Sequence, residues 1–205
     1  MIKYVLRSWC CLLPSSEGPM SSPNVFATGY YSSRLNDDPH HPDIQHTLTY
    51  IGFTQFFAQI FGPFTGVHRD LLQRYLRGFI GRDGNMVATT LVRPRSTGYV
   101  TLNKTNIYGK PIIEPNYFAD DRDLEALVDG MQNLIDFYEK TPAYAAAGAK
   151  FFPKPFPPCR RHHFRSHNYY RCHVQHLTMT LWHFSGTCKM GKIGDPDAVT
   201  DSRLR

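Results

Sequence analysis

A long amphipathic segment, residues 120 to about 140, constrains the fold more than any other feature of the sequence. Its apolar residues recur at helical spacing, and Asp120 stands where an N-cap belongs. The acids of the first turn suit the positive end of the helix dipole. The pattern predicts one continuous helix, with Asp123, Glu125 and Asp129 exposed. The residues expected to be buried against a sheet are Leu124, Leu127, Val128, Met131, Leu134 and Ile135.

Alternating or β-rich stretches predict strands elsewhere in the chain, and two weaker helical patterns accompany them. The tetrapeptide Arg-Ser-Thr-Gly, residues 95–98, favours a compact turn that would make the last two strands antiparallel neighbours in the sheet beneath the long helix. Strands and helices without a βαβ rhythm indicate an α+β fold, an antiparallel sheet with helices packed on one face. The strands are expected at 25–32, 43–51, 85–94 and 98–104, and the weaker helices at 68–80 and 167–180.

The sequence contains no dinucleotide-binding element of the Rossmann type. Such an element needs a strand that runs into a Gly-x-Gly-x-x-Gly turn and then a helix. The nearest glycine spacing, Gly78, Gly81 and Gly84, instead follows a helical pattern and precedes a strand. We also expect no membrane span, because no apolar run approaches about 18 residues, and Arg7 interrupts the opening segment before a targeting signal forms.

The formal net charge of +6 raises the question of a nucleic-acid partner. The basic residues are scattered among acids, apart from the cluster at residues 159–165, and no nucleic-acid-binding module is recognisable. A solvated loop explains that cluster better. We therefore expect no nucleic-acid partner.

The five cysteines do not include a pair at the Cys-x-x-Cys spacing of a zinc or thioredoxin-like centre. Cys159 and Cys172 flank a polar loop, with twelve residues between them. A disulfide is conceivable there and would imply an oxidising compartment, but two buried free thiols fit equally well.

The ten histidines include one, His183, in an unusual setting. The histidine-containing stretches 41–46 and 161–167 lack helical ligand pairs with matching carboxylates, so we expect no metal site. His183 follows an apolar run and precedes Gly186, whose backbone can approach a bulky group. From physical chemistry alone, a hydrogen-bonded core histidine is the favoured interpretation. Ser185 and Cys188 lack an oriented base, so nucleophilic catalysis is not supported.

Residues 91–131 and 172–205 resemble the glucose-methanol-choline (GMC) family of flavin oxidoreductases, in particular its insect glucose-dehydrogenase-like branch. The resemblance begins near Gly18, so residues 18–205 are expected to form the substrate-binding domain, truncated at its C-terminal end, and residues 1–17 remain an N-terminal segment without assignment. The matching residues occur in the expected order: Arg93-Pro94, Ser96, Gly98, Pro111, Asn116-Tyr117, Gly186-Thr187-Cys188 and Asp195-Pro196.

The resemblance implies an FAD-dependent enzyme that oxidises the CH-OH group of an alcohol or sugar, with His183 as the base beside the flavin. Hydride transfer from an alcohol carbon leaves a carbonyl, so the hydroxyl proton must pass to a base. Phe184 departs from the branch, which usually has proline there. The resemblance further implies secretion.

The family's flavin-binding glycine motif and its second catalytic histidine or asparagine are not in this sequence. We therefore expect the chain alone to be inactive. A non-catalytic fragment or paralogue, acting as a binding or interaction module, is the alternative.

Overall fold

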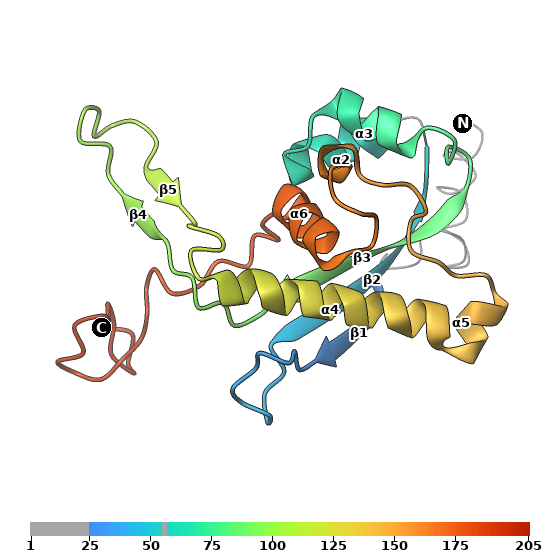
Figure 1. Ribbon diagram of the computed structural model, residues 1–205. Helices are drawn as coiled ribbons and strands as arrows, with labels where there is room; N and C mark the ends of the chain where they lie inside the picture. Colours follow the sequence, from blue (N-terminus) through green and yellow to red (C-terminus); the bar gives the residue numbers. More distant parts are fainter. Residues whose placement is uncertain (1–24, 55–56) are drawn as a thin grey trace, which may run out of the picture.

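A computed structural model describes residues 25–54 and 57–205 of the protein (Figure 1). Its main sheet contains β1 (Val25–Tyr31), β2 (Ile44–Gly52) and β3 (Asp83–Leu91), all antiparallel and in that order. Ile44 lies opposite Leu91 in this register, and the next residue of β2 on the same face is His46. The strands predicted at 25–32, 43–51 and 85–94 are thus confirmed. The N-terminal segment 1–17 lies outside the described residues.

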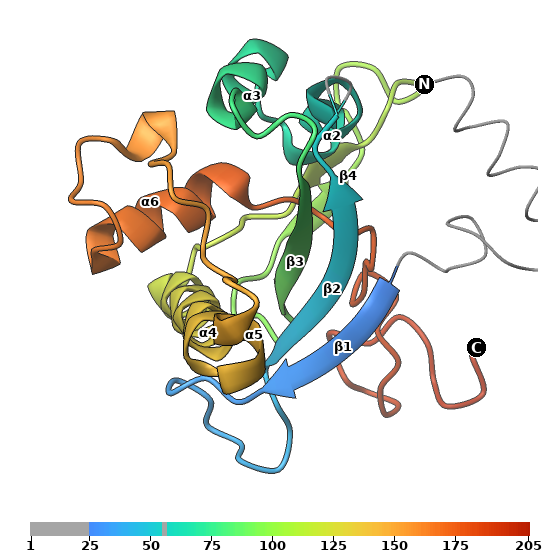
Figure 2. The ribbon, with the colours of Figure 1, turned by 90° about the vertical axis from the view of Figure 1, so that its right-hand side faces the viewer.

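The helices gather on one face of the sheet, as Figure 2 shows for α4 and α6. Helices α2 and α3 lie in the connection from β2 to β3, and α4 contacts β2, β3 and α6. This arrangement confirms the α+β fold with helices packed on one face of an antiparallel sheet. The helices are α2 (Phe57–Thr65), α3 (Arg69–Leu76), α4 (Asp121–Lys140), α5 (Pro142–Ala146) and α6 (His167–Leu177), with a 3₁₀ turn, η2 (Pro157–Cys159).

Helix α4 is the continuous helix that the sequence predicts. The side chain of Asp120 accepts a hydrogen bond from the backbone N–H of Arg122, which caps the first turn. The helix ends at Lys140 because Thr141 precedes Pro142 and takes an extended conformation. Of the six residues expected to be buried, Leu124, Val128 and Ile135 are buried, while Leu127, Met131 and Leu134 are partly buried.

Two acids of α4 were predicted to be exposed, and the prediction is wrong. Asp123 and Asp129 are only 4% and 5% exposed. The carboxylate of Asp123 accepts the backbone N–H groups of Arg95 and Ser96, at 2.9 and 2.8 Å. These hydrogen bonds offset the desolvation of a buried charge, and their donors lie far away in the sequence. Glu125, also predicted to be exposed, is partly buried beside Arg171.

The predicted turn at residues 95–98 does not join neighbouring strands. Strand β3 pairs with β2, whereas β4 (Tyr99–Thr101) pairs with β5 (Ile112–Glu114) in a separate exposed hairpin. Only a glycine fits at position 98, because a Cβ atom there would lie 2.0 Å from the carbonyl oxygen of Glu114. The backbone of residues 95 and 96 is bound to Asp123 instead, so the chain leaves the main sheet at this point.

The core lies between the helices and the connection that precedes α6. Phe156 and Tyr169 are fully buried, and the Tyr169 hydroxyl accepts the backbone N–H of Phe156 at 3.0 Å. Helix α3 ends at Leu76, earlier than predicted, but Phe79 beyond it still packs against Phe152 with ring centroids 4.4 Å apart. Across the described residues, no helix has both the length and the apolar character that a bilayer crossing requires.

Candidate active-site segment

His183 lies in the segment that follows α6, residues 178–205. Helix α6 ends at Leu177, three residues before the predicted end, and Thr178 caps it by donating its hydroxyl proton to the Val174 carbonyl oxygen. The rest of the segment has no helix or strand, apart from one bridge between Met190 and Thr200. Figure 1 shows the segment, in red, extending away from the helices. We call residues 178–205 the C-terminal segment.

The imidazole of His183 is exposed, as are the aromatic rings on both sides of it. Trp182 is 54% exposed and Phe184 is 74% exposed. A core histidine would be buried and held by a hydrogen bond, whereas the described residues of this chain leave the His183 ring exposed. The ring is instead accessible to a molecule that approaches from outside the described residues.

The backbone turns sharply on both sides of His183. Trp182 has a φ of +59°, a left-handed conformation that costs a bulky residue about 1–2 kcal/mol. Its backbone N–H donates to the hydroxyl oxygen of Thr180 at 3.0 Å, which supports the turn. Gly186 follows with a φ of +94°, which favours glycine. The two turns hold His183 and Phe184 on a short exposed bend.

A compact loop follows this bend and includes the Asp195-Pro196 pair. The backbone N–H of Gly191 donates to the Thr200 carbonyl oxygen at 3.0 Å, closing the loop. Asp195 accepts the backbone N–H of Asp197 at 3.0 Å and pairs with Lys189 at 3.4 Å. The backbone hydrogen bond is the main reason that the pKa of Asp195 is lowered. The role of Asp195 here is structural, because its oxygens hold the loop together.

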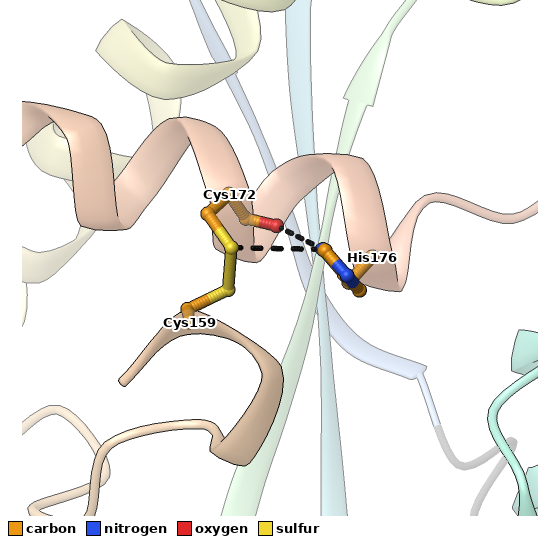
Figure 3. A group of neighbouring side chains, drawn as sticks. All are labelled: Cys159, Cys172 and His176. Carbon is orange, nitrogen blue, oxygen red and sulfur yellow. Dashed lines mark hydrogen bonds between the residues drawn. A yellow bond between two sulfur atoms is a disulfide. The ribbon is translucent and has the colours of Figure 1, made fainter. Parts of the chain in front are cut away.

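Cys159 and Cys172 form a disulfide that ties η2 to α6, with Cα atoms 5.8 Å apart (Figure 3). His176 lies beside it, with Nδ1 2.9 Å from the Cys172 carbonyl oxygen and 3.6 Å from the Cys172 sulfur. These three residues are the one group in the described chain with metal-ligand spacing. Both sulfurs are consumed by the disulfide, so a single imidazole remains as a ligand. Cys188 is an exposed free thiol.

Two histidines, His46 and His173, are partly buried, and sequence reasoning did not identify either. Burial lowers the pKa of His173 to about 4, with a smaller effect of the same sign from His176. Burial also lowers the pKa of His46, whose Nδ1 lies 3.2 Å from the Thr89 hydroxyl oxygen. Its buried Nε2 has no hydrogen-bond partner among the described residues. His173 lies four residues after Tyr169, on the same face of α6. This spacing could have identified His173 in the sequence as a residue that packs beside Tyr169.

The basic cluster at residues 159–165 lies in the loop between η2 and α6. Its Arg160, Arg161 and His163 side chains are exposed, as expected for a solvated loop. Arg165 pairs with Glu139 at 2.7 Å, and this hydrogen bond is the main cause of the lowered pKa of Glu139. An open depression of about 470 Å³ lies beside this pair and is also lined by Arg34 and Asp129. Because these charges are already paired, the depression is a poor candidate for a catalytic site.

Neither α4 nor α6 offers a cradle for a dinucleotide diphosphate, which needs free N–H groups at a helix N-terminus. The first turn of α4 carries Asp121 and Asp123, and Asp120 caps it, so negative charge already occupies that end. The Ser166 hydroxyl oxygen caps α6 by accepting the backbone N–H of Tyr169. These helix ends do not fit a diphosphate.

The chain is similar in sequence to several characterised oxidoreductases. It is 30% identical over 190 residues to Glucose dehydrogenase [FAD, quinone] of Drosophila pseudoobscura pseudoobscura, covering 92% of this chain and 28% of that protein. It is also 32% identical over 119 residues to Patulin synthase of Penicillium expansum, covering 58% of this chain and 18% of that protein. The chain therefore spans less than a third of the length of either relative.

The fold and a family profile agree with these sequence relatives. A crystal structure of formate oxidase matches 96% of this chain and 34% of its own, with a TM-score of 0.68 at 19% identity, which shows the shared fold. Residues 94–205, more than half of the chain, match the family described as GMC oxidoreductase, and this match includes the hairpin, α4, α6 and the His183 bend. The chain belongs to the GMC oxidoreductase family.

Proposed function

We propose that the protein to which this chain belongs is an FAD-dependent oxidoreductase that oxidises the CH-OH group of an alcohol or sugar, and that His183 is the base. The observation that carries this proposal is the exposed imidazole of His183 inside the part of the chain that matches the family. The two Drosophila relatives named Glucose dehydrogenase [FAD, quinone] support the cofactor and the substrate class.

The chemistry needs a proton acceptor beside the carbon that loses hydride. A bound flavin supplies the hydride acceptor. A ring nitrogen of His183 takes the hydroxyl proton as the carbonyl forms, because an imidazole nitrogen can act as a general base. The flanking rings of Trp182 and Phe184 provide apolar surface that would exclude water from the proton transfer.

Neither α4 nor α6 supplies a cradle for the diphosphate of FAD. A side-chain cap already accepts one N–H group at the start of each helix, and α4 also carries acids in its first turn, which would repel an anion. We therefore expect the purified 205-residue chain to bind no FAD tightly and to oxidise no alcohol. The absorbance spectrum of the purified chain tests this, and a stoichiometric flavin band would contradict it.

The decisive test is His183→Ala in the complete protein. Turnover should fall about a hundredfold or more, the usual scale for a lost general base, because the hydroxyl proton loses its acceptor. Flavin content and melting temperature should stay unchanged, since the ring is exposed and contributes little packing. Turnover, flavin absorbance and thermal unfolding are measured on the same preparation.

His163→Ala is the matched control, because His163 is also exposed but lies in the loop before α6. It should leave turnover unchanged. A large loss of turnover in this control, with flavin bound, would mean that the base is assigned to the wrong histidine. Loss of flavin or of stability in the His183 variant would indicate a structural role instead. A complete protein without any CH-OH oxidation would favour the non-catalytic interaction module.

A further inference from the structure

One asparagine of the sequence lies in an acceptor pattern for N-linked glycosylation. Asn103 is followed by Lys104 and Thr105, which matches Asn-x-Ser/Thr with a residue other than proline in the middle. The chain has eight asparagines, and none of the other seven has serine or threonine two residues later. Because the pattern is short, its position in the structure decides whether the asparagine can be glycosylated.

The acceptor triplet lies in the loop of the exposed hairpin, between β4 and β5. Figure 1 shows this loop projecting from the body of the molecule, away from the helices that form the core. Lys104 and Thr105 are exposed, and Asn103 is partly exposed. A bulky hydrophilic group attached at this loop would extend into solvent without disturbing the buried residues.

The triplet also has a local geometry that leaves the reactive amide nitrogen available. The Thr105 hydroxyl donates to Oδ1 of Asn103 at 2.7 Å, and the Thr105 backbone N–H donates to the same oxygen at 3.0 Å. Nδ2 of Asn103 has no hydrogen-bond partner among the described residues. Two hydrogen bonds to Oδ1 withdraw electron density from the amide, which makes loss of a proton from Nδ2 easier.

A separate part of the molecule points to the compartment in which such glycosylation occurs. The Cys159–Cys172 disulfide joins η2 to α6, far along the chain from the hairpin. Structural disulfides form and persist in oxidising environments such as the lumen of the secretory pathway. The acceptor triplet and the disulfide are therefore independent observations that agree.

We propose that Asn103 carries an N-linked oligosaccharide in the mature protein. Nδ2 forms a bond to the anomeric carbon of a lipid-diphosphate-linked oligosaccharide, while the bond from that carbon to the diphosphate oxygen breaks. The lipid diphosphate leaves, and Nδ2 loses one proton to a base of the transferase. Nothing is oxidised or reduced. The glycan keeps the hairpin loop on the outer surface of the complete protein, so any contact of the hairpin with other protein surface uses its strands.

The test is mass spectrometry of the complete protein secreted from cultured eukaryotic cells. The peptide that contains residues 103–105 should carry a glycan, and release by a peptide N-glycosidase should convert Asn103 to aspartate. Asn103→Gln and Thr105→Val should both lose the glycan, whereas Thr105→Ser should retain it because a hydroxyl is still present. Asn106→Gln is the matched control, since Asn106 is exposed in the same loop but lacks the pattern, and it should leave the glycan in place.

The state of the cysteines is measured on the same sample. An unmodified Asn103 in protein whose Cys159–Cys172 disulfide has formed would overturn the proposal, because that protein has passed through the oxidising compartment. An unmodified Asn103 with both thiols free would overturn it as well, because the secreted protein has met the transferase and the disulfide that supports the proposal would be absent. Retention of the glycan in Thr105→Val would show that it is attached elsewhere.

Discussion

The helical core and the C-terminal segment differ in almost every physical respect. The core contains Phe156 and Tyr169, which are fully buried, and a disulfide. The C-terminal segment holds His183, Trp182 and Phe184, all exposed, on a bend made by local backbone turns. The residues that stabilise this chain therefore lie in a different region from the residue proposed to do chemistry. Substitutions in the two regions should therefore affect different measurements.

The apolar side chains of the two regions also differ in their exposure to solvent. Ile193 is 93% exposed and Leu204 is 75% exposed, whereas apolar residues of the core cluster are nearly inaccessible. The structure leaves these two side chains in solvent. If the segment is covered in the complete protein, substitutions there will cost more stability than their exposure in this chain suggests.

The largest expected effect on stability is that of Leu124→Ala. Leu124 is fully buried in α4, so its truncation should lower the free energy of unfolding by about 3–5 kcal/mol. Leu204→Ala is the matched control, and it should change stability by less than about 0.5 kcal/mol. Urea unfolding of both variants gives the comparison. A Leu204 variant that loses as much stability as the Leu124 variant would show that the C-terminal segment is packed in the complete protein.

Removal of the disulfide should have the next largest effect. The Cys159–Cys172 bond closes a loop with a sequence separation of 13 residues. Its loss increases the conformational entropy of the unfolded chain. The free energy of unfolding should therefore fall by about 3 kcal/mol. The measurement is urea unfolding of a double Cys159→Ala and Cys172→Ala variant. Cys188→Ala removes an exposed free thiol and should leave stability unchanged. Equal stability of the double variant and the parent would mean that the bond adds nothing to the core.

Acid should destabilise the core through His173. Because burial lowers its pKa to about 4 from the ordinary 6.5, the unfolded chain binds a proton that the folded chain resists. Stability is therefore full above pH 6.5 and is lost as pH falls toward 4, by about 2 kcal/mol at pH 5. Urea unfolding at pH 7 and pH 5 measures this loss. His173→Gln should reduce the pH dependence, while His163→Ala should leave it intact.

Periodicity in the sequence predicted the long helix and the main sheet, but it did not predict α2, α5 or β5. The helix α4 and the three strands of the main sheet were found because each has a local pattern that repeats over many residues. The pairing of β4 was missed because strand partners are chosen by distant contacts. The backbone at Arg95 and Ser96 is held by the Asp123 carboxylate, and no local pattern reports that hydrogen bond.

The surroundings of the candidate site were also not predictable from local sequence patterns. Resemblance to the family singled out His183 as a base, whereas physical reasoning alone favoured a buried histidine, and the ring is exposed in this chain. Burial of a single side chain in a loop depends on what the rest of the protein places around it, and a short motif does not encode that. His173 is partly buried and packs beside Tyr169, and its helical spacing from Tyr169 was readable in the sequence.

Substitution of Asp129 should have the smallest of these effects on stability. It tests what the burial of an acid of α4 that was wrongly predicted to be exposed contributes. Its carboxylate accepts the Tyr31 hydroxyl at 3.0 Å and the Arg34 backbone N–H at 2.9 Å, and it also pairs with the Arg34 side chain. Asp129→Ala would leave these donors without their acceptor, so we expect a loss of about 1–2 kcal/mol.

Asp136→Ala is the control for this variant, because Asp136 is an exposed acid of the same helix, paired at 2.7 Å with Lys140 one turn later. Such surface pairs contribute about 0.3–0.5 kcal/mol, so the control should barely change the urea midpoint. If the two variants lose the same stability, the long-range hydrogen bonds of Asp129 contribute no more than a surface ion pair. The burial of that carboxylate would then be a consequence of helix packing, as at Gly130, where an added Cβ atom would lie only 3.0 Å from the side chain of Ile44 in β2.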